Sequence, residues 1–519
     1  MFSKYTDAET FKKIVDFDSV SNMWQNCVDN YGSLVAINDD NKDYTFSDIE
    51  NDVSYFRTTL SENGIKTGDR VGVLAPNSYE FVKAYLAVTT LGAVAVLLPP
   101  HLDEMTVFGI SMKFGLKAIV FEGSMDNKLS IARAKNPALS LIKTTENATS
   151  PTSSVKVPKS APCVIIFTGG TTGKSKGATL SNGAVMMGTK NGCYGYKEVF
   201  NQKYFLVLPL THVFGLIRNL MTSLYTGSAL HICRNNKEMF KEIAVFRPTI
   251  MVLVPALAEM ALNLSKQFGK NMLGDSLKYI ICGAAQVPPY LIREYKKIGV
   301  TMFPGYGLTE SANLVSGNPE SETKPDSVGI PYAGQELKLV DGELWLKGDN
   351  MMMGYVGDDE ENAKAYEDGW FKTGDLARFD DEGFLYIVGR IKEIIVLSSG
   401  ENISPAELEN KFDEIDVVQD CLVYEDFENG KQILAMEVLP RAVVLSKVAA
   451  EDKSQYLLNR RMELAKELLL NSTNTVGEVA KAVGFGDIYA FSHAFTRLFG
   501  VSPQLWRRQP DRNDFAGQK

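Results

Sequence analysis

Residues 167–177, FTGGTTGKSKG, combine small, hydroxyl-bearing and basic side chains in a pattern that could hold phosphate groups. Glycines let the backbone approach a ligand closely, while the threonines, the serine and the lysines add hydroxyl donors and positive charge. The run follows the apolar residues 163–166, which predict a buried strand. We expect the phosphates to be bound by Thr168, Gly169, Gly170, Thr171, Thr172, Gly173, Lys174 and Lys176.

Two other interpretations fit this run less well. A Walker A loop has a glycine five positions before its glycine–lysine pair, and here that position holds Thr168. A flexible Gly/Ser/Thr linker rarely carries so many hydrogen-bond donors directly behind a strand. The run therefore predicts a concave polyphosphate site of another kind.

The elements around this run alternate between strand and helix patterns, which predicts an α/β fold with a parallel sheet. Strands are expected at 71–74, 250–255 and 279–283, and Ser47 is expected to cap the helix that follows it. The apolar run 84–100 contains polar and glycine positions, so it favours a buried helix followed by a strand over a membrane span.

Composition limits the class of protein. At 519 residues the chain needs more than one domain, and its 45% hydrophobic and 23% charged residues are typical of a globular protein. A net charge of −9 argues against nucleic-acid binding along the whole chain. The six cysteines include no CxxC pair, and the N-terminus has no apolar signal region, so we expect a cytoplasmic protein without a zinc site.

The phosphate-binding run resembles that of the adenylate-forming superfamily, which includes acyl-CoA synthetases, nonribosomal peptide adenylation domains and luciferases. Further segments similar to that superfamily follow in its order as far as Pro405: PLTHVFG (209–215), GAAQVP (283–288), GYGLTES (305–311), WFKTGDL (370–376) and YIVGRIKEII (386–395). The resemblance implies a large N-terminal domain of layered sheets and helices over 1–390, then a small α+β domain over 391–443. It also implies that the protein uses ATP and Mg²⁺, together with CoA or the pantetheine of a carrier protein.

The resemblance also implies roles for individual residues. Glu310 would bind magnesium, and Thr309 would contact the phosphates. The nucleoside would be held by Gly283, Ala284, Tyr306, Gly307, Asp375 and Arg390. The acyl group and the incoming thiol would pass His212, Val213, Phe214, Ala285 and Gly400. Lys174, Thr309, Glu310 and Lys392 are the expected catalytic residues, with Lys392 at the hinge of the small domain.

The chain departs from the superfamily after residue 440. The expected lysine motif near the end of the small domain is missing, and Lys447 and Lys453 stand in a different context. The small domain therefore is predicted to be truncated by about half, and adenylation is expected to be impaired.

Residues 444–519 follow a different pattern. A helix, a tight turn and a second helix over 488–498 are predicted, with Asp487 as the cap of the second helix. They resemble one helix-turn-helix unit of AraC-type regulators, with Phe485, Phe491, Phe495 and Phe499 as core. From Lys453 to the end there are ten basic and six acidic residues, which fits contact with DNA. The candidate DNA contacts are Tyr489, Ser492, His493 and Arg497.

Three functions remain open from the sequence. The first is an acyl-CoA-synthetase-like enzyme that converts a carboxylic acid into an acyl-adenylate and then a thioester; apolar pocket residues favour an aryl or fatty acid. The second is a transcription regulator whose ligase core senses an acyl or nucleotide ligand, and such a single DNA-binding unit would need a homodimer to bind strongly. The third is an enzyme that loads a carrier protein. A helical cap without DNA binding is the alternative for the C-terminal module.

Overall fold

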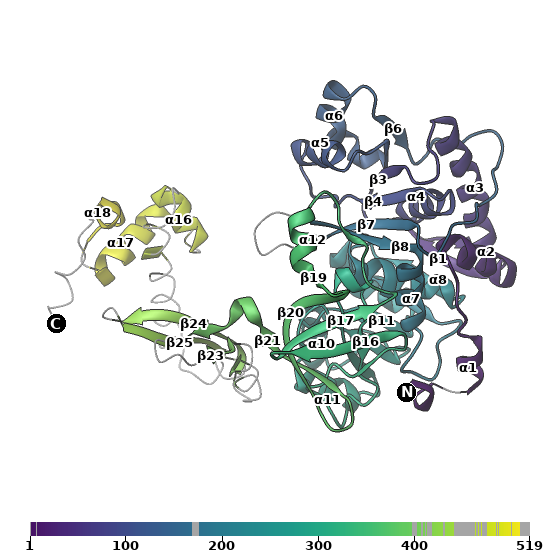
Figure 1. Ribbon diagram of the computed structural model, residues 1–519. Helices are drawn as coiled ribbons and strands as arrows, with labels where there is room; N and C mark the ends of the chain where they lie inside the picture. Colours follow the sequence, from purple (N-terminus) through teal and green to yellow (C-terminus); the bar gives the residue numbers. More distant parts are fainter. Residues whose placement is uncertain are drawn as a thin grey trace. The chain divides into compact units, whose positions relative to one another are not determined.

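The computed structural model describes residues 2–6, 8–168, 176–396, 402–405, 408–409, 412, 418–428, 431–440, 462, 465–466, 469, 475–483, 485, 487–499 and 501–508. The chain divides into two compact units, Met1–Asn410 and Lys411–Lys519. The first unit contains three large sheets with helices packed against them, which confirms the predicted α/β class (Figure 1).

The nine-stranded sheet has a parallel centre. Its order is β15-β14-β13-β12-β11-β9-β10-β1-β2, and the strands from β13 to β1 run parallel while the outer three are antiparallel. Both strands predicted near 250 and 280 are present and pair with each other. The strands are β1 (Val35–Asp39), β2 (Lys42–Thr45), β9 (Lys203–Leu206), β10 (Ala229–Ile232), β11 (Ile250–Leu253), β12 (Tyr279–Cys282), β13 (Thr301–Tyr306), β14 (Ser316–Gly317) and β15 (Ile330–Pro331).

The seven-stranded sheet carries the strand before the phosphate-binding run. Its order is β18-β8-β7-β4-β3-β5-β6, with β7 to β6 parallel and β8 and β18 antiparallel. The apolar strand predicted before that run is confirmed as β7. The strands are β3 (Arg70–Leu74), β4 (Val94–Leu97), β5 (Ala118–Phe121), β6 (Ser140–Lys143), β7 (Pro162–Thr168), β8 (Lys176–Ser181) and β18 (Gly354–Tyr355).

A third, antiparallel sheet follows in the sequence and supplies part of the ligand site. It has the order β16-β17-β20-β19, and β21 pairs with β20. Its strands are β16 (Gln335–Val340), β17 (Glu343–Gly348), β19 (Tyr366–Glu367), β20 (Trp370–Phe379) and β21 (Leu385–Arg390). The short strands β22 (Ile395–Val396) and β23 (Asn402–Ile403) pair beyond it.

Helices of the first unit bury apolar faces against these sheets in one large core. Helix α4 is buried on nearly every side, and β4 follows it, so the apolar run 84–100 is a buried helix and strand as predicted. Among the described residues no helix combines the length and the apolar character needed to cross a membrane. The longer helices are α2 (Val20–Tyr31), α3 (Phe46–Glu62), α4 (Tyr79–Thr90), α5 (Glu104–Lys113), α7 (Asn182–Asn191), α9 (Met239–Phe246), α10 (Pro255–Phe268) and α11 (Pro289–Lys297). The shorter ones are α1 (Ala8–Lys13), α6 (Ser130–Lys135), α8 (Thr222–Tyr225) and α12 (Asp359–Ala365).

The prediction that Ser47 caps α3 is wrong. Thr45 ends β2 in an extended conformation, and its hydroxyl accepts the backbone amide of Asp48 at 3.1 Å. The Asp48 carboxylate accepts the amide of Thr45 in return at 2.9 Å, which completes a capping box. Ser47 therefore lies inside the first helical turn.

The second unit contains a hairpin and a small helical cluster. The hairpin strands are β24 (Val418–Glu428) and β25 (Lys431–Pro440). The helices are α16 (Val476–Ala482), α17 (Ile488–Phe499) and α18 (Pro503–Arg508). The four predicted phenylalanines belong to the cluster's core, with Phe491 and Phe495 fully buried. The carboxylate of Asp487 accepts the amides of Tyr489 and Ala490 at 3.1 Å, so the predicted cap of α17 is confirmed.

Candidate active site

Strands β7 and β8 present the two ends of the phosphate-binding run next to each other. They are antiparallel neighbours, and Thr168 at the end of β7 is directly opposite Lys176 at the start of β8. Both residues line the larger cavity of the first unit, which has a volume of about 910 Å³. The predicted phosphate residues between them, Gly169, Gly170, Thr171, Thr172, Gly173 and Lys174, lie outside the described residues.

Many of the residues predicted for ligand binding line this one cavity. They come from the nine-stranded sheet, the seven-stranded sheet, the third sheet and the segments that follow their strands, although they are up to about two hundred positions apart in the sequence. The predicted residues on its wall are Thr168, Lys176, His212, Val213, Phe214, Gly283, Ala284, Tyr306, Gly307, Thr309, Glu310, Arg390 and Lys392. Motifs that are far apart in the sequence therefore line one cavity in the folded chain.

Glu310 is held in the turn after β13 by contacts on both its backbone and its side chain. Its carbonyl accepts the amide of Met352 at 2.7 Å, and its carboxylate accepts the hydroxyl of Tyr355 at 2.6 Å. Gly307 makes the turn possible, because a Cβ there would lie 1.3 Å from the carbonyl oxygen of Asn313. Burial and the charge of Glu310 raise the pKa of Tyr355 far above its usual value, so the phenol remains a neutral donor.

The donor set around Glu310 fits magnesium bound together with a nucleotide. No group of three or more histidine, cysteine, aspartate or glutamate side chains with metal-site spacing occurs among the described residues. Magnesium is commonly held by one or two carboxylates, with phosphate oxygens and water completing its six positions. Glu310 on the wall of a large cavity supplies such a carboxylate.

Lys176 is positioned by acidic and aromatic neighbours. Its ammonium forms an ion pair with Glu361 on α12, and it lies over the ring of Tyr355 at 5.1 Å. This ion pair lowers the pKa of Glu361. Lys176 is thus held at the cavity wall. Tyr355 contacts both Lys176 and the carboxylate of Glu310.

A second cavity of about 520 Å³ adjoins the first and is lined by the predicted nucleoside residues except Gly283, which lines the first alone. Ala284, Tyr306, Gly307 and Arg390 line both cavities, whereas Asp375 and Ala285 line the second. Ala285 was predicted beside the acyl group with His212; it lines the second cavity, whereas His212 lines the first. Its predicted role stays a prediction.

Asp375 is a buried carboxylate with two partners. It accepts the hydroxyl of Tyr306, and its Oδ1 lies 2.8 Å from Nε of Arg390. Burial raises its pKa, although the hydrogen bond from Tyr306 and the charge of Arg390 act in the opposite direction. Gly374 precedes it with φ of +73°, and its amide is accepted by Glu343 at 2.8 Å, which fixes the bend in β20.

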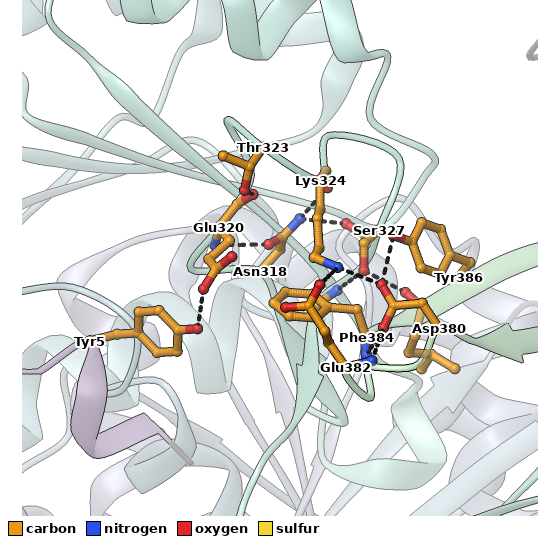
Figure 2. A network of polar contacts seen from close by, with 12 residues as sticks. Tyr5, Asn318, Glu320, Thr323, Lys324, Ser327, Asp380, Glu382, Phe384 and Tyr386 are labelled. Carbon is orange, nitrogen blue, oxygen red and sulfur yellow. Dashed lines mark hydrogen bonds and ion pairs between the residues drawn. The ribbon is translucent and has the colours of Figure 1, made fainter.

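A polar network connects the segment after β14 to the hairpin that leads into β21 (Figure 2). Lys324 donates to Asp380 at 2.7 Å and to Glu382 at 2.9 Å, and Ser327 donates to the carbonyl of Leu385 at 2.8 Å. Asn318 donates to the carbonyls of Lys324 and Ser327. The network ties the two segments together at the start of the strand that ends in Arg390.

One part of the wall of the larger cavity is mainly aromatic. His212 accepts the amide of Phe214 at its Nδ1 at 3.2 Å, and burial of its surroundings lowers its pKa, so the ring is neutral at pH 7. Phe214 begins the π-helix η3 (Phe214–Met221), which also places Arg218 on the wall. Other rings on this wall are Tyr194, Tyr196, Phe303 and Tyr332.

Several residues on the walls were not identified from the sequence. Tyr355 and Glu361 could not be assigned from the sequence, because they come from β18 and α12. These elements reach the site only through the pairing of β18 with β8 and the contacts of α12 with β18. Arg218 had a visible signal: it is one charge in the apolar run FGLIRNLM. Asn313 follows the YGLTE segment by three residues and could have been included with it.

Lys392 and Gly400 belong to the predicted hinge region. Lys392 lies in the 3₁₀ turn η6 (Ile391–Glu393) and lines the larger cavity. Gly400 lies outside the described residues. The predicted domain boundary at 390/391 stays a prediction, since the first compact unit continues to Asn410.

Helix α17 in the second unit has one buried and one exposed face. Phe491 and Phe495 are buried, while Tyr489, His493 and Arg497 are exposed and Ser492 is partly exposed. Positions three and four apart share one side of a helix, so the four predicted DNA contacts form one continuous stripe.

Comparisons with known proteins agree with this geometry. A profile described as AMP-binding enzyme matches residues 24–356, and one described as helix-turn-helix domain matches residues 445–509. A long-chain-fatty-acid–CoA ligase of Mycobacterium bovis is 26% identical over 74% of this chain and 75% of its own length. An indoleacetate–CoA ligase of Aromatoleum aromaticum is 29% identical over 78% of this chain and 85% of its own. The structure of an anthranilate CoA ligase in complex with anthranoyl-AMP superimposes with a TM-score of 0.75 at 20% identity, covering 86% of this chain and 91% of that one.

Proposed function

Because the chain belongs to the AMP-binding enzyme family, we propose that it activates a carboxylic acid with ATP and transfers the acyl group to a thiol. The observation that supports this best is the pair of adjoining cavities. One carries Thr168, Lys176, Thr309 and Glu310, and the other carries the buried carboxylate of Asp375. An anion site beside a ribose-binding carboxylate is what a nucleoside triphosphate needs.

In the proposed first step a carboxylate oxygen of the acid bonds to the α-phosphorus of ATP. The bond from that phosphorus to the bridging oxygen breaks, pyrophosphate leaves with the electron pair, and an acyl-adenylate remains. Lys174, Lys176 and Thr309 stabilise the phosphate charge, while Asp375 and Arg390 hold the ribose. Magnesium, held by Glu310, neutralises phosphate charge when bound.

In the proposed second step a thiol sulfur attacks the acyl carbon. The carbon–sulfur bond forms, the carbon–oxygen bond to AMP breaks, and the thiol proton is released. Both relatives described above are CoA ligases, which favours CoA over a carrier protein as the acceptor. We assign Lys392 to the hinge and Gly400 to the thiol channel. Because the C-terminal lysine motif is missing, we expect adenylation to be slow.

The aromatic wall around Phe214 favours an aryl acid over a fatty acid. ATP–pyrophosphate exchange with a panel of aryl and fatty acids tests the proposal, because exchange requires the first step alone. Exchange with at least one acid, followed by thioester formation with CoA, is the expected result. Absence of exchange with every acid, together with ligand-dependent retention of DNA, would instead establish the sensor function.

DNA binding by the second unit is a second proposal, favoured by the helix-turn-helix match and by the exposed stripe on α17. We infer that α17 enters the major groove, with Tyr489, Ser492, His493 and Arg497 at base edges and phosphates. A homodimer would supply the second half-site contact.

Replacing Arg497 with alanine is expected to weaken binding of the full chain to selected duplex DNA by about tenfold or more, the scale of one lost arginine contact. The measurement is fluorescence anisotropy at two salt concentrations, with DNA selected from a random pool. Arg133→Ala, an exposed arginine on α6 in the first unit, is the matched control and should have no effect. Equal affinities for the wild type and Arg497→Ala would contradict the inferred role of α17.

A further inference from the structure

Arg218 is a buried cation on the wall of the larger cavity. Only 3% of its surface is exposed. Its Nη2 donates to the hydroxyl of Tyr196 at 3.2 Å, whereas its buried Nη1 has no protein acceptor. Within the described part of the chain no ion pair connects it to an acidic side chain. A buried charge without a counter-ion destabilises the empty protein.

The guanidinium of Arg218 lies over the ring of Tyr196, with its Cζ 5.7 Å from the ring centre. Its neighbours include the hydroxyls of Tyr196 and Tyr332 and the thiol of Cys193. Burial raises the pKa of Cys193 to about 12 and raises the pKa of Tyr332 well above its usual value. Cys193 and Tyr332 are therefore neutral near pH 7, and the guanidinium keeps a full positive charge.

Asn313 supplies a second unpartnered donor on the same cavity. It is 8% exposed, and its Nδ2 is buried without a protein acceptor. Its backbone has φ of +78°, in the left-handed region that asparagine adopts more readily than most residues other than glycine. Two donors on one cavity wall, both lacking acceptors in the protein, call for a ligand that brings oxygen acceptors with it.

Aromatic side chains line the same cavity as these two donors. Tyr196 and Phe303 lie with ring centroids 5.9 Å apart, and Phe2 stacks on Tyr332 at 4.6 Å. All four residues line the cavity that Arg218 and Asn313 share with Phe214. This part of the wall therefore combines aromatic rings with the buried positive charge of Arg218.

We propose that Arg218 binds a second anionic group of the acid substrate, so that the site selects aryl acids that carry an additional carboxylate. The proposal deepens the acid-activating function proposed above and rests on it. One carboxylate of the acid reacts with ATP, and the other forms a charge-assisted hydrogen bond with the guanidinium, with Asn313 as an additional donor. With a fatty acid or an unsubstituted aryl acid, the buried guanidinium would instead contact only carbon atoms of the bound acid.

The test uses matched pairs of acids and the full chain. Each pair consists of an aryl monocarboxylate and its para-carboxylated counterpart: benzoate with terephthalate, and phenylacetate and phenylpropionate with theirs. The pairs place the second carboxylate at different depths. The variants are Arg218→Met, which keeps the unbranched first part of the side chain and removes the charged guanidinium, and Arg218→Lys, with Arg133→Met as the surface control. Readouts are ATP–pyrophosphate exchange, calorimetric binding of each acid, and thermal unfolding.

We expect the wild type to prefer the dicarboxylate of at least one pair by tenfold or more in kcat/KM. Arg218→Met should abolish this preference while retaining activity on the monocarboxylate, and Arg218→Lys should keep part of it. The ligand-free Arg218→Met protein should unfold at the same or a higher temperature, because an uncompensated charge has been removed. A merely structural arginine would instead give a lower unfolding temperature and equal losses with both acids, and this would overturn the proposal.

The two proposals fail in different ways. Absence of exchange with any acid would refute acid activation, and calorimetry would then still decide whether terephthalate or a longer dicarboxylate binds through Arg218. Exchange with monocarboxylates, without any preference for a dicarboxylate, would leave acid activation established and would refute the role of Arg218.

Discussion

Replacement of Glu310 with glutamine is expected to lower the rate of ATP–pyrophosphate exchange by about 100- to 1000-fold, the scale of losing one group that stabilises transition-state charge. Glutamine keeps the size of the side chain and can still accept the hydroxyl of Tyr355, which lies 2.6 Å from the carboxylate. It lacks the negative charge that a magnesium ligand needs here. The change therefore separates metal binding from packing.

The measurement is exchange rate against magnesium concentration, accompanied by calorimetric titration of ATP with magnesium. Tyr355→Phe removes only the hydrogen bond to Glu310 and should cost about tenfold, as the loss of a group that orients a metal ligand does. Glu360→Gln, on the exposed side of α12, is the matched control. An unchanged magnesium dependence in Glu310→Gln would assign the metal to another residue.

Replacement of Asp375 with asparagine is expected to weaken AMP binding by about 100-fold. The two ribose hydroxyls would lose a charged acceptor, and a hydrogen bond to a charged group contributes about 1.5–3 kcal/mol. The carboxylate is 2% exposed and is held by Tyr306 and Arg390, so it is fixed before the ribose arrives. Calorimetry with AMP at pH 7 measures the effect. Asp368→Asn, at an exposed turn with φ of +49° that asparagine tolerates, is the control.

The pH dependence of this change follows from the pKa of Asp375, which burial raises above its usual value of 3.8. The folded state thus binds this proton more tightly than the unfolded chain does. The charged carboxylate costs folding free energy at neutral pH, and this cost disappears as the pH falls through the raised pKa. Asp375→Asn should therefore not lower the unfolding temperature at pH 7. Any gain in stability over the wild type should shrink on acidification, and wild-type affinity for AMP should fall in the same range.

A lower unfolding temperature of Asp375→Asn at pH 7, with AMP affinity unchanged, would show that this carboxylate supports the fold and does not bind the nucleotide. Loss of affinity in Asp368→Asn as well would indicate a general effect of charge. Each outcome distinguishes a ribose-binding group from a structural one.

The local sequence was sufficient for the features that depend on neighbouring residues. The alternation of strands and helices, the buried strand before the phosphate-binding run and the cap at Asp487 are confirmed, because propensity and periodicity act over a few residues. The family follows from the order of the motifs from 167 to 395. The cap of α3 was misplaced by two residues because both Thr45 and Ser47 can cap, and the end of β2 selects the first.

Only the tertiary structure decided which of these residues share a cavity. Tyr355 reaches Glu310 because β18 pairs with β8, and Asp375 meets Tyr306 across 69 positions of sequence. That Nη1 of Arg218 has no acceptor among the described residues is visible only in three dimensions, because it depends on everything packed around the side chain. Sequence patterns predict which residues can do chemistry, whereas the partners that set their charge, pKa and position come from strands far apart in the chain.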